Sequence, residues 1–465
     1  MVSSILVLGA GRSSSSLISY LEAGSKEFNW SVTVGDVSFA AAQGLAVGND
    51  KAIQFDIRDV ENSRKAIRSA DVVISMIPAH LHARVAALCL QEKKHLLTAS
   101  YVSDEMKSFD EQAREKNLLF LNECGLDPGI DHMSAMQVID TIKEEGGELH
   151  SFESFTGGLI APETDRENPW RYKFTWNPRN VVMAGQGTSK FLYDGQYKYI
   201  PYQQLFKRIT PVSIPGYGEY EGYANRDSLK YIETYGLHGV RTMLRGTLRF
   251  NGFCAAWDVL VQLGCTDDSY ALEGVDRMTH RDFIDAFLNG DTGQGIEEKL
   301  LRQFRLHSDG PEMQRLTWSG FFEKEKVGLP QGTPAQILEH ILNKKWKLLP
   351  EDRDLVVMWH RFVYGKKGKE KEIQSTLVAR GENGGHTAMA RTVGLPLAIA
   401  AKLLLQGKIK VRGVVIPTSK EIYQPVLKEL KTLGIELSER YLTPRLRQGF
   451  GVQAGPSPGR RGEEF

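Results

Sequence analysis

The fold prediction begins with the segment Ile5-Leu6-Val7-Leu8-Gly9-Ala10-Gly11-Arg12-Ser13-Ser14. A short apolar run breaks at two glycines and leads into a helical segment that begins near Ser13. A buried strand, a tight turn and a helix N-terminus in this order form the anion-binding arrangement of dinucleotide-binding folds. Gly9 permits the turn and Gly11 lets the backbone approach a pyrophosphate, while Ser14 replaces the third glycine of the G-x-G-x-x-G pattern. The segment predicts a nucleotide site, which the rest of the chain has to support.

Composition narrows the class of protein. The chain has 465 residues, 41% of them hydrophobic and 25% charged, with a formal net charge of +1. This length suits two or three domains, and the balanced charge gives no reason to expect nucleic acid or an anionic membrane as a partner. We expect no signal peptide, because the first residues lack a basic region and a cleavage site, and no membrane span, because no apolar run reaches the required length. Four cysteines without C-x-x-C spacing indicate reduced thiols, a cytoplasmic protein and no metal site; they are Cys89, Cys124, Cys254 and Cys265.

Up to residue 122 the chain alternates short apolar runs with amphipathic helical segments. Strands and helices at this spacing predict βαβ units and a doubly wound parallel sheet, with the ligand at the carboxyl ends of the strands. We therefore predict a Rossmann dinucleotide-binding domain over residues 1–125. The six expected strands are 5–8, 31–34, 52–55, 71–77, 95–99 and 118–121.

Asp36 ends the second expected strand. An acidic residue there accepts hydrogen bonds from the adenosine ribose and repels a 2′-phosphate, which indicates NAD. The distance from Gly9 exceeds the usual ~20 residues, and Asp36 could instead be a turn former. The guanidinium of Arg12 could reach a 2′-phosphate, so NADP is possible as well.

Three residues follow the fifth and sixth strands, where nicotinamide and substrate would meet. Ser100 and Tyr101 are candidate substrate contacts, or else form a polar turn. Asp127 precedes Pro128, and its carboxylate could accept a proton or bind an ammonium. Its alternative role is to cap the helix that Pro128 opens. We expect His82 to be a surface or capping residue.

The style of the sequence changes after residue 149. Aromatic-rich, strand-like pieces broken by Gly and Pro predict a mixed or antiparallel sheet in a second, α+β substrate domain over residues 126–389. The pieces are 152–155, 173–176, 181–183, 191–192 and 198–200. We expect a helical insertion over about 266–348 and a hairpin over 354–380. A buried helix over 387–405 begins a segment, about 390–440, that completes the first domain, and 441–465 should be a disordered tail.

Arg245, Thr247 and Arg249 alternate along one expected strand, so their side chains share a face. This face suits a clamp for a carboxylate. Solvated salt bridges would give the same pattern, and the spacing alone does not choose between them.

Up to about residue 440 the chain resembles the glutamate-forming saccharopine dehydrogenases, also called saccharopine reductases. It is especially similar to the dehydrogenase half of bifunctional aminoadipic-semialdehyde synthases. Motifs from nearly the whole length carry the resemblance. They are Gly9-Ala10-Gly11, Val73-Ile74-Ser75-Met76-Ile77-Pro78, Thr98-Ala99-Ser100-Tyr101, Gly125-Leu126-Asp127-Pro128-Gly129-Ile130-Asp131-His132, Tyr172-Lys173-Phe174-Thr175-Trp176, Asn225-Arg226-Asp227-Ser228, Arg245-Gly246-Thr247-Leu248-Arg249 and Thr392-Val393-Gly394-Leu395-Pro396.

The resemblance implies an oxidoreductase of lysine metabolism. Such an enzyme removes hydride from the carbon beside the secondary amine of saccharopine, and water then splits the imine into glutamate and 2-aminoadipate 6-semialdehyde. For this reaction, Asp127 and Tyr101 are our candidates for handling protons during amine deprotonation and imine hydrolysis. The implied substrate contacts are Ser100, Tyr101, Asp127, Arg226, Thr247, Leu248 and Arg249. The implied cofactor contacts are Gly9, Ala10, Gly11, Arg12, Ser13, Asp36, Val37, Ser38, Asp56, Ile57, Ile77, Ala99, Ser100, Leu126, Asp127, Pro128 and Trp176.

Two departures from the family pattern matter. Asp36 and Val37 stand where NADP-using fungal relatives resemble a neutral–Arg pair, which again favours NAD. Thr156 replaces a family cysteine, so any role of that cysteine falls to Thr156 or is lost.

Two other functions stay open at this stage. The same fold could act on another amine–carbonyl conjugate with fewer carboxylates, such as carboxynorspermidine, or serve as a non-enzymatic nucleotide sensor. In each case we expect a small-molecule ligand. The apolar-rich second domain makes a homodimer plausible.

Overall fold

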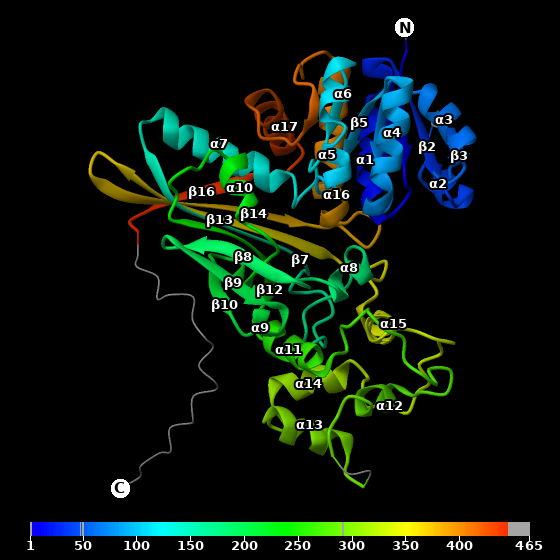
Figure 1. Ribbon diagram of the computed structural model, residues 1–465, viewed down its shortest axis with the longest axis vertical. Helices are drawn as coiled ribbons and strands as arrows, with labels where there is room; N and C mark the ends of the chain where they lie inside the picture. Colours follow the sequence, from blue (N-terminus) through cyan, green and yellow to red (C-terminus); the bar gives the residue numbers. More distant parts are fainter. Residues whose placement is uncertain (1, 47, 49–50, 291–292, 445–465) are drawn as a thin grey trace.

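The computed structural model describes residues 2–46, 48, 51–290 and 293–444. Its N-terminal sheet has seven strands in the order β15-β6-β5-β4-β1-β2-β3, and all neighbours are parallel (Figure 1). Six of these strands follow the doubly wound order 3-2-1-4-5-6, so the predicted Rossmann fold is confirmed. The strands are β1 (Ser3–Leu8), β2 (Trp30–Asp36), β3 (Lys51–Gln54), β4 (Val72–Ser75), β5 (His95–Thr98), β6 (Leu119–Leu121) and β15 (Gly413–Val415).

Helices cover both faces of this sheet, and its central strands β1, β4, β5 and β6 are accordingly buried on both sides. One face packs against α1, α16 and α17, and the other against α3, α4 and the α5–α6 region. The helices of this domain are η1 (Arg12–Ser14), α1 (Ser15–Phe28), α2 (Phe39–Leu45), α3 (Val60–Arg68), η2 (Ala79–Leu81), α4 (His82–Glu92), α5 (Asp104–Lys107), α6 (Asp110–Glu115), α16 (Ala388–Leu405) and α17 (Lys420–Thr432).

The second sheet is mixed and runs across the middle of Figure 1. Its main path is β10-β11-β12-β7-β13-β14-β16, and the β8–β9 hairpin attaches to β12. Strands β7 and β12 are parallel, and the other neighbours on the path are antiparallel. The strands are β7 (Glu148–Ile160), β8 (Thr188–Tyr193), β9 (Gln196–Pro201), β10 (Ile209–Ile214), β11 (Gly218–Ala224), β12 (Thr242–Phe250), β13 (Asp354–Lys366), β14 (Lys369–Arg380) and β16 (Leu437–Leu442).

Helix α7 (Ile130–Glu144) packs on the face of this sheet that looks toward the first domain, and α11 (Phe253–Leu263) and α15 (Pro334–Trp346) pack on the other side. The region predicted as a helical insertion carries α12 (His280–Asp285), α13 (Ile296–Phe304), α14 (Pro311–Trp318) and α15, drawn at the lower end of Figure 1. The short helices that remain are α8 (Pro178–Val182), α9 (Tyr202–Leu205) and α10 (Lys230–Thr234).

Helix α16 packs against both sheets. By length and composition it could span a membrane, but 78% of its apolar window is buried inside the protein. Its first turn is fixed by Asp354 of β13, whose carboxylate accepts the backbone N–H groups of Ala388 and Met389 at 2.6 and 2.9 Å. Farther along, a Cβ at Gly394 would lie 3.0 Å from Leu17 of α1. Glycine therefore allows the close approach that places α16 in the core.

Three sequence predictions differ from the structure. Residues 181–183 fall at the end of α8, not in a strand, because the Asn177 side chain caps this helix and Pro178 opens it. Residues 173–176 form an irregular segment held by a hydrogen bond from the Phe174 N–H to the Trp346 carbonyl, 2.7 Å. Tyr441 and Leu442, assigned to the tail, belong to β16. The rest of the predicted tail from 445 onward lies outside the described residues.

Candidate active site

The glycine loop after β1 has the shape that a pyrophosphate needs. Gly9 has φ +103°, and a Cβ there would lie 2.9 Å from the carbonyl carbon of Met76, so a larger residue would clash with the backbone after β4. A Cβ at Gly11 would meet no atom within 4 Å, which leaves open space beside the helix N-terminus. The Ser14 hydroxyl donates to the Gly9 carbonyl at 2.8 Å and fastens the turn. This loop therefore fits a dinucleotide.

Asp36 lies against this loop. Its carboxylate accepts the backbone N–H of Ala10 at 2.8 Å and that of Ser38 at 2.9 Å. Arg12, considered a candidate for a 2′-phosphate, instead donates to the Phe174 carbonyl of the second domain at 3.1 Å. The structure thus brings Asp36 and Ala10 together and directs the Arg12 guanidinium elsewhere.

The other predicted cofactor contacts lie along the carboxyl edge of the same sheet. Asp56 and Ile57 follow β3, Ile77 follows β4, Ala99 and Ser100 follow β5, and Leu126, Asp127 and Pro128 follow β6. Trp176 reaches this region from the second domain and packs against both large cores. Val37 is exposed.

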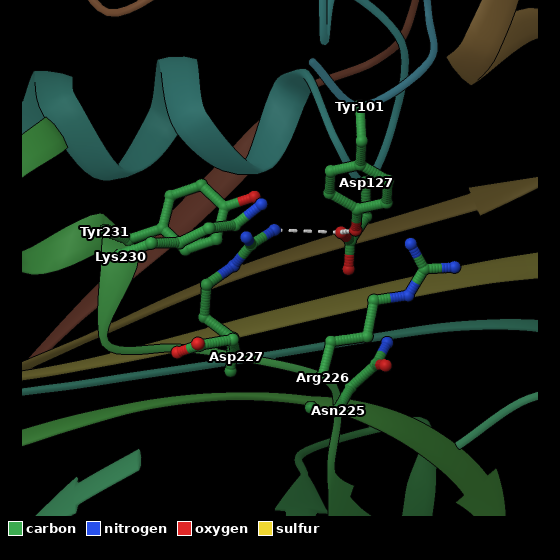
Figure 2. A pocket seen from close by; sticks show the side chains of 9 residues that line it. Tyr101, Asp127, Asn225, Arg226, Asp227, Lys230 and Tyr231 are labelled. Atoms are coloured by element: carbon green, nitrogen blue, oxygen red, sulfur yellow. Dashed lines mark hydrogen bonds and ion pairs between the residues drawn. The ribbon is translucent and has the colours of Figure 1, made fainter. Parts of the chain in front are cut away.

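Asp127 is the centre of a polar cluster between the two domains (Figure 2). Its Oδ1 accepts the Tyr101 hydroxyl at 3.1 Å and Nη2 of Arg245, on β12, at 2.9 Å. Asp131, in the first turn of α7, pairs with the same Arg245 nitrogen, and its other oxygen accepts the Gly129 N–H at 2.6 Å. Asp127 does not cap α7, for which Gly129 is the N-cap residue.

A pocket that is open to solvent lies beside this cluster. Two cations, Arg226 and Lys230, lie in its lining next to the ring of Tyr101, at 4.7 and 5.2 Å from the ring centroid (Figure 2). Within the part of the chain that the structure describes, neither cation forms an ion pair with a carboxylate. The lining consists of Tyr101, Asp127, Asn225, Arg226, Asp227, Lys230, Tyr231, Arg245 and Gly246.

The two carboxylates around Arg245 have different electrostatic surroundings. Burial and the negative charge of Asp131 raise the pKa of Asp127, and Arg245 only partly offsets them. Burial also acts to raise the pKa of Asp131, but the charges of His132 and Arg245 outweigh it and hold that pKa below its usual range. Burial raises the pKa of Tyr101, so its hydroxyl stays protonated at neutral pH. Asp127 is therefore the member of the pair suited to exchange a proton.

None of the three predicted substrate contacts on β12 lies in the pocket lining. Thr247 contacts the lining residue Asn225, whose Nδ2 donates a hydrogen bond to the Thr247 hydroxyl at 3.2 Å. Leu248 is buried in the core on the opposite face of the sheet. Arg249 is buried farther along the strand, with its guanidinium 4.9 Å from the ring of Tyr172. Arg245, whose role the alternating pattern left undecided, occupies the position beside Asp127.

The Ser100 hydroxyl lies within hydrogen-bond distance of His82. The prediction that His82 is a surface or capping residue was wrong. His82 is buried, with Nε2 2.8 Å from the Ser100 hydroxyl and Nδ1 2.9 Å from the Ser75 hydroxyl. Burial lowers its pKa to about 4, so the ring is neutral at physiological pH. His82 begins the buried face of α4, which continues through Val85, Ala86 and Cys89. This helical periodicity was the available signal for its burial.

Comparisons with known proteins agree with the site and the fold. Residues 5–121 match the family model described as saccharopine dehydrogenase NADP binding domain, and residues 125–435 match saccharopine dehydrogenase C-terminal domain. The chain is 33% identical over 449 residues to saccharopine dehydrogenase (NADP(+), L-glutamate-forming) of Schizosaccharomyces pombe, covering 94% of this chain and 99% of that protein.

Longer proteins match as well. The chain is 35% identical over 441 residues to the mitochondrial alpha-aminoadipic semialdehyde synthase of Mus musculus, covering 93% of this chain but 47% of that protein. It thus spans about half the length of this relative. The apo structure of saccharopine dehydrogenase (L-Glu forming) from Saccharomyces cerevisiae superimposes with a TM-score of 0.85 at 33% identity, covering 95% of this chain and 100% of that one. The resemblance predicted from the motifs is confirmed, and the chain belongs to the saccharopine dehydrogenase family.

Proposed function

We propose that this protein oxidises saccharopine with a nicotinamide dinucleotide and hydrolyses the product to L-glutamate and 2-aminoadipate 6-semialdehyde. The observation that carries the proposal is the pocket in which Asp127 and Tyr101 face Arg226 and Lys230, two cations that pair with no carboxylate of the described residues. Saccharopine has three carboxylates and a secondary amine, so it needs several cations and one proton acceptor in the same pocket. Relatives that span nearly the same length carry this activity in their names.

Each group in the pocket has a task that its geometry supports. The Asp127 carboxylate can take the proton that the secondary ammonium must lose before its neighbouring carbon is oxidised. The Tyr101 hydroxyl, hydrogen-bonded to Asp127 at 3.1 Å, keeps that carboxylate oriented toward the pocket. After water has added to the imine carbon, Asp127 can return this proton to the nitrogen, which leaves as the amine of glutamate when the carbon–nitrogen bond breaks. The dinucleotide, held by the loop from Gly9 to Ser13, would accept the hydride.

Arg249 is a third cation that supports a substrate with three carboxylates. It is 4% exposed; its Nη1 donates to the Leu248 carbonyl at 2.9 Å, but its Nε has no hydrogen-bond partner among the residues described. A buried guanidinium without an acidic partner is costly unless a ligand compensates it. Its position on the same face of β12 as Arg245 and Thr247 supports the prediction that it binds a substrate carboxylate.

The choice between NAD and NADP is a finer question than the use of a nicotinamide dinucleotide. The family model and the fungal relatives name NADP. In this chain we infer a preference for NAD, because the Asp36 carboxylate lies beside Ala10 and would repel a 2′-phosphate. Replacing Asp36 with Ser should raise kcat/KM for NADP relative to NAD by about tenfold, since roughly 1.4 kcal/mol of repulsion is removed. A wild-type enzyme that prefers NADP would refute this inference.

The activity can be tested directly. The purified chain is mixed with saccharopine and either dinucleotide, and the absorbance of reduced nicotinamide is followed together with the release of L-glutamate. Stoichiometric formation of both products supports the proposal. Faster turnover of carboxynorspermidine would favour the alternative substrate class, and dinucleotide binding without turnover of either compound would indicate a sensor.

We also infer a reducing, cytoplasmic setting and a small-molecule ligand only. The four cysteines are free and buried, which supports reduced thiols. A homodimer is part of the proposal, and the mass in solution by light scattering would test it.

A further inference from the structure

Arg245 lies between two carboxylates that differ in their access to the pocket. Its Nη2 donates to Asp127 and to Asp131. The Asp127 side chain is 18% exposed, whereas the Asp131 side chain is 1% exposed. The guanidinium also lies over the ring of Tyr231, with Cζ 4.0 Å from the centroid. Arg245 is thus held in one orientation, with one partner facing the pocket and the other facing the interior.

Asp131 is fixed by groups on its own helix and by the second domain. Its Oδ1 accepts the Gly129 N–H, and its Oδ2 lies 3.6 Å from Nδ1 of His132. His132 is itself held between Glu123, 2.8 Å from Nε2, and the Tyr235 hydroxyl, 2.5 Å from Nδ1. These contacts hold Asp131 on the interior side of Arg245, while Asp127 has only Tyr101 and Arg245 as hydrogen-bond partners among the described residues.

We propose that Asp131 and Arg245 are positioning residues that keep the Asp127 carboxylate aimed into the pocket and free to exchange a proton. The proposal rests on the function proposed above, because it names what prepares Asp127 for that reaction. Arg245 orients Asp127 through its hydrogen bond. Asp131 balances the positive charge of Arg245, so that Asp127 is not held permanently ionised as the sole partner of a buried guanidinium.

The charges around Asp127 agree with this division of roles. The titratable groups around it are Tyr101 from the end of β5, Asp131 and His132 from α7, Arg245 from β12, and Arg226, Asp227, Lys230 and Tyr231 in the pocket lining. The pKa of Asp127 is raised by burial and Asp131, and that of Asp131 is lowered by His132 and Arg245 despite its burial. Two carboxylates that share one cation are thereby separated into a fixed anion and a group that can titrate.

Two substitutions should move the pH profile in opposite directions. In Asp131→Asn the charge of Arg245 is no longer balanced, so the pKa of Asp127 falls and the acidic limb of kcat/KM for saccharopine oxidation shifts to lower pH. In Arg245→Gln the stabilising cation is lost, so this limb shifts to higher pH. We expect about one pH unit in each direction, equivalent to a tenfold change in kcat/KM below the limb. Structural damage alone would reduce the rate without shifting the limb in opposite directions.

The control is Glu372→Gln, which removes one of the two carboxylates around Arg361 in the same sheet, away from the pocket lining. This variant should leave the acidic limb unmoved. Shifts of Asp131→Asn and Arg245→Gln in the same direction, or no shift in either, would overturn the proposal.

A second measurement does not depend on turnover or on these variants. The protein is labelled with 13C at the aspartate carboxyl carbons, the Asp127 signal is assigned with Asp127→Asn, and the wild-type signals are titrated. The Asp127 carboxyl should titrate at higher pH than the Asp131 carboxyl, which shares Arg245 with it. The reverse order would contradict the proposal even if saccharopine proved not to be the substrate, and absent turnover with the expected order would refute only the proposed function.

Discussion

The second sheet contains two buried arginines that are each bound by two carboxylates, and only one of them lies at the pocket. Arg361 on β13 donates to Glu153 of β7 at 2.7 Å and to Glu372 of β14 at 2.9 Å. Both partners belong to the neighbouring strands of the same sheet. Arg245 on β12 instead binds Asp127 and Asp131, which the loop after β6 and helix α7 bring against the sheet.

The difference shows that the residue types do not make the site. Around Arg361 the charges are mutually satisfied inside one sheet, so the cluster serves the fold. Around Arg245 one carboxylate comes from the carboxyl edge of the Rossmann sheet, contacts a tyrosine hydroxyl and faces the pocket that Arg226 and Lys230 line. We infer that Arg245 belongs to the candidate site because its partners come from outside its own sheet. The predictions below test this distinction.

The largest expected effect is on activity at Asp127. Asp127→Asn keeps the shape of the side chain but removes the proton acceptor, and kcat/KM for saccharopine should fall about 10²–10⁴-fold. Circular dichroism and thermal unfolding should show a folded protein, because Arg245 keeps Asp131 as a partner. Steady-state kinetics with the purified variant provide the measurement.

The matching change at the other arginine is Glu153→Gln, and its effect should be the opposite. Activity should stay within about twofold, while the free energy of unfolding falls by as much as ~3–5 kcal/mol, the usual loss when one partner of a buried ion pair is removed. If Glu153→Gln abolished activity in a stable protein, the distinction between the two clusters would be wrong.

Arg226 should affect substrate binding more than catalysis. A hydrogen bond to a charged group contributes ~1.5–3 kcal/mol, so Arg226→Gln should raise KM for saccharopine roughly 10–100-fold with a smaller change in kcat. Arg380→Gln, at an exposed pair with Glu163, is the control and should change neither. An unchanged KM in Arg226→Gln would favour a substrate with fewer carboxylates.

Features with a local cause could be predicted from the sequence. The six strands of the Rossmann sheet follow from apolar runs that alternate with amphipathic helices, and the turn after β1 follows from two glycines. Asp127 and Tyr101 were placed at one edge because the carboxyl ends of parallel strands meet there. Their hydrogen bond, 3.1 Å, is the contact that this topology implies.

Features that depend on distant partners could not be predicted. The alternation along β12 put Arg245, Thr247 and Arg249 on one face, but the chain does not state which arginine meets Asp127. Which arginine meets Asp127 depends on how the second sheet, which contains β12, is placed against the carboxyl edge of the Rossmann sheet. Lys230 was missed although it lies two residues after the Asn225-Arg226-Asp227-Ser228 motif, because only the fold of the α10 segment brings its side chain into the pocket.

Replacing His82 should reduce kcat/KM moderately without changing the pH profile, because its ring is neutral. Its hydrogen bond fixes the Ser100 hydroxyl, and losing a bond worth ~1 kcal/mol should lower kcat/KM about fivefold in His82→Phe. Since its pKa is lowered to about 4 by burial, the substitution should leave the pH profile of activity near neutrality unchanged. His80→Phe, at an exposed position two residues earlier, is the control. A shifted profile in His82→Phe would show that His82 exchanges protons itself.

Stability in acid, rather than activity, also distinguishes the two arginine clusters. His360 follows Trp359 and precedes Arg361 on β13, but its side chain faces α7, where Nε2 lies 2.8 Å from the Ser134 hydroxyl. Burial lowers its pKa from 6.5 to about 4. The unfolded chain therefore binds a proton that the folded protein resists, and stability is lost as pH falls from 6.5 toward 4.

At about pH 5 this one histidine should account for ~2 kcal/mol of the lost free energy of unfolding. His360→Gln should lose less stability than the wild type between about pH 7 and about pH 5, as measured by urea unfolding at both values. Glu372→Gln, on the Arg361 side, should lose stability at both pH values without changing the dependence on pH. The opposite result, a flatter pH dependence in Glu372→Gln but not in His360→Gln, would place the acid-sensitive group beside Arg361. The distinction between the cluster around Arg245 and the structural cluster around Arg361 would then be wrong.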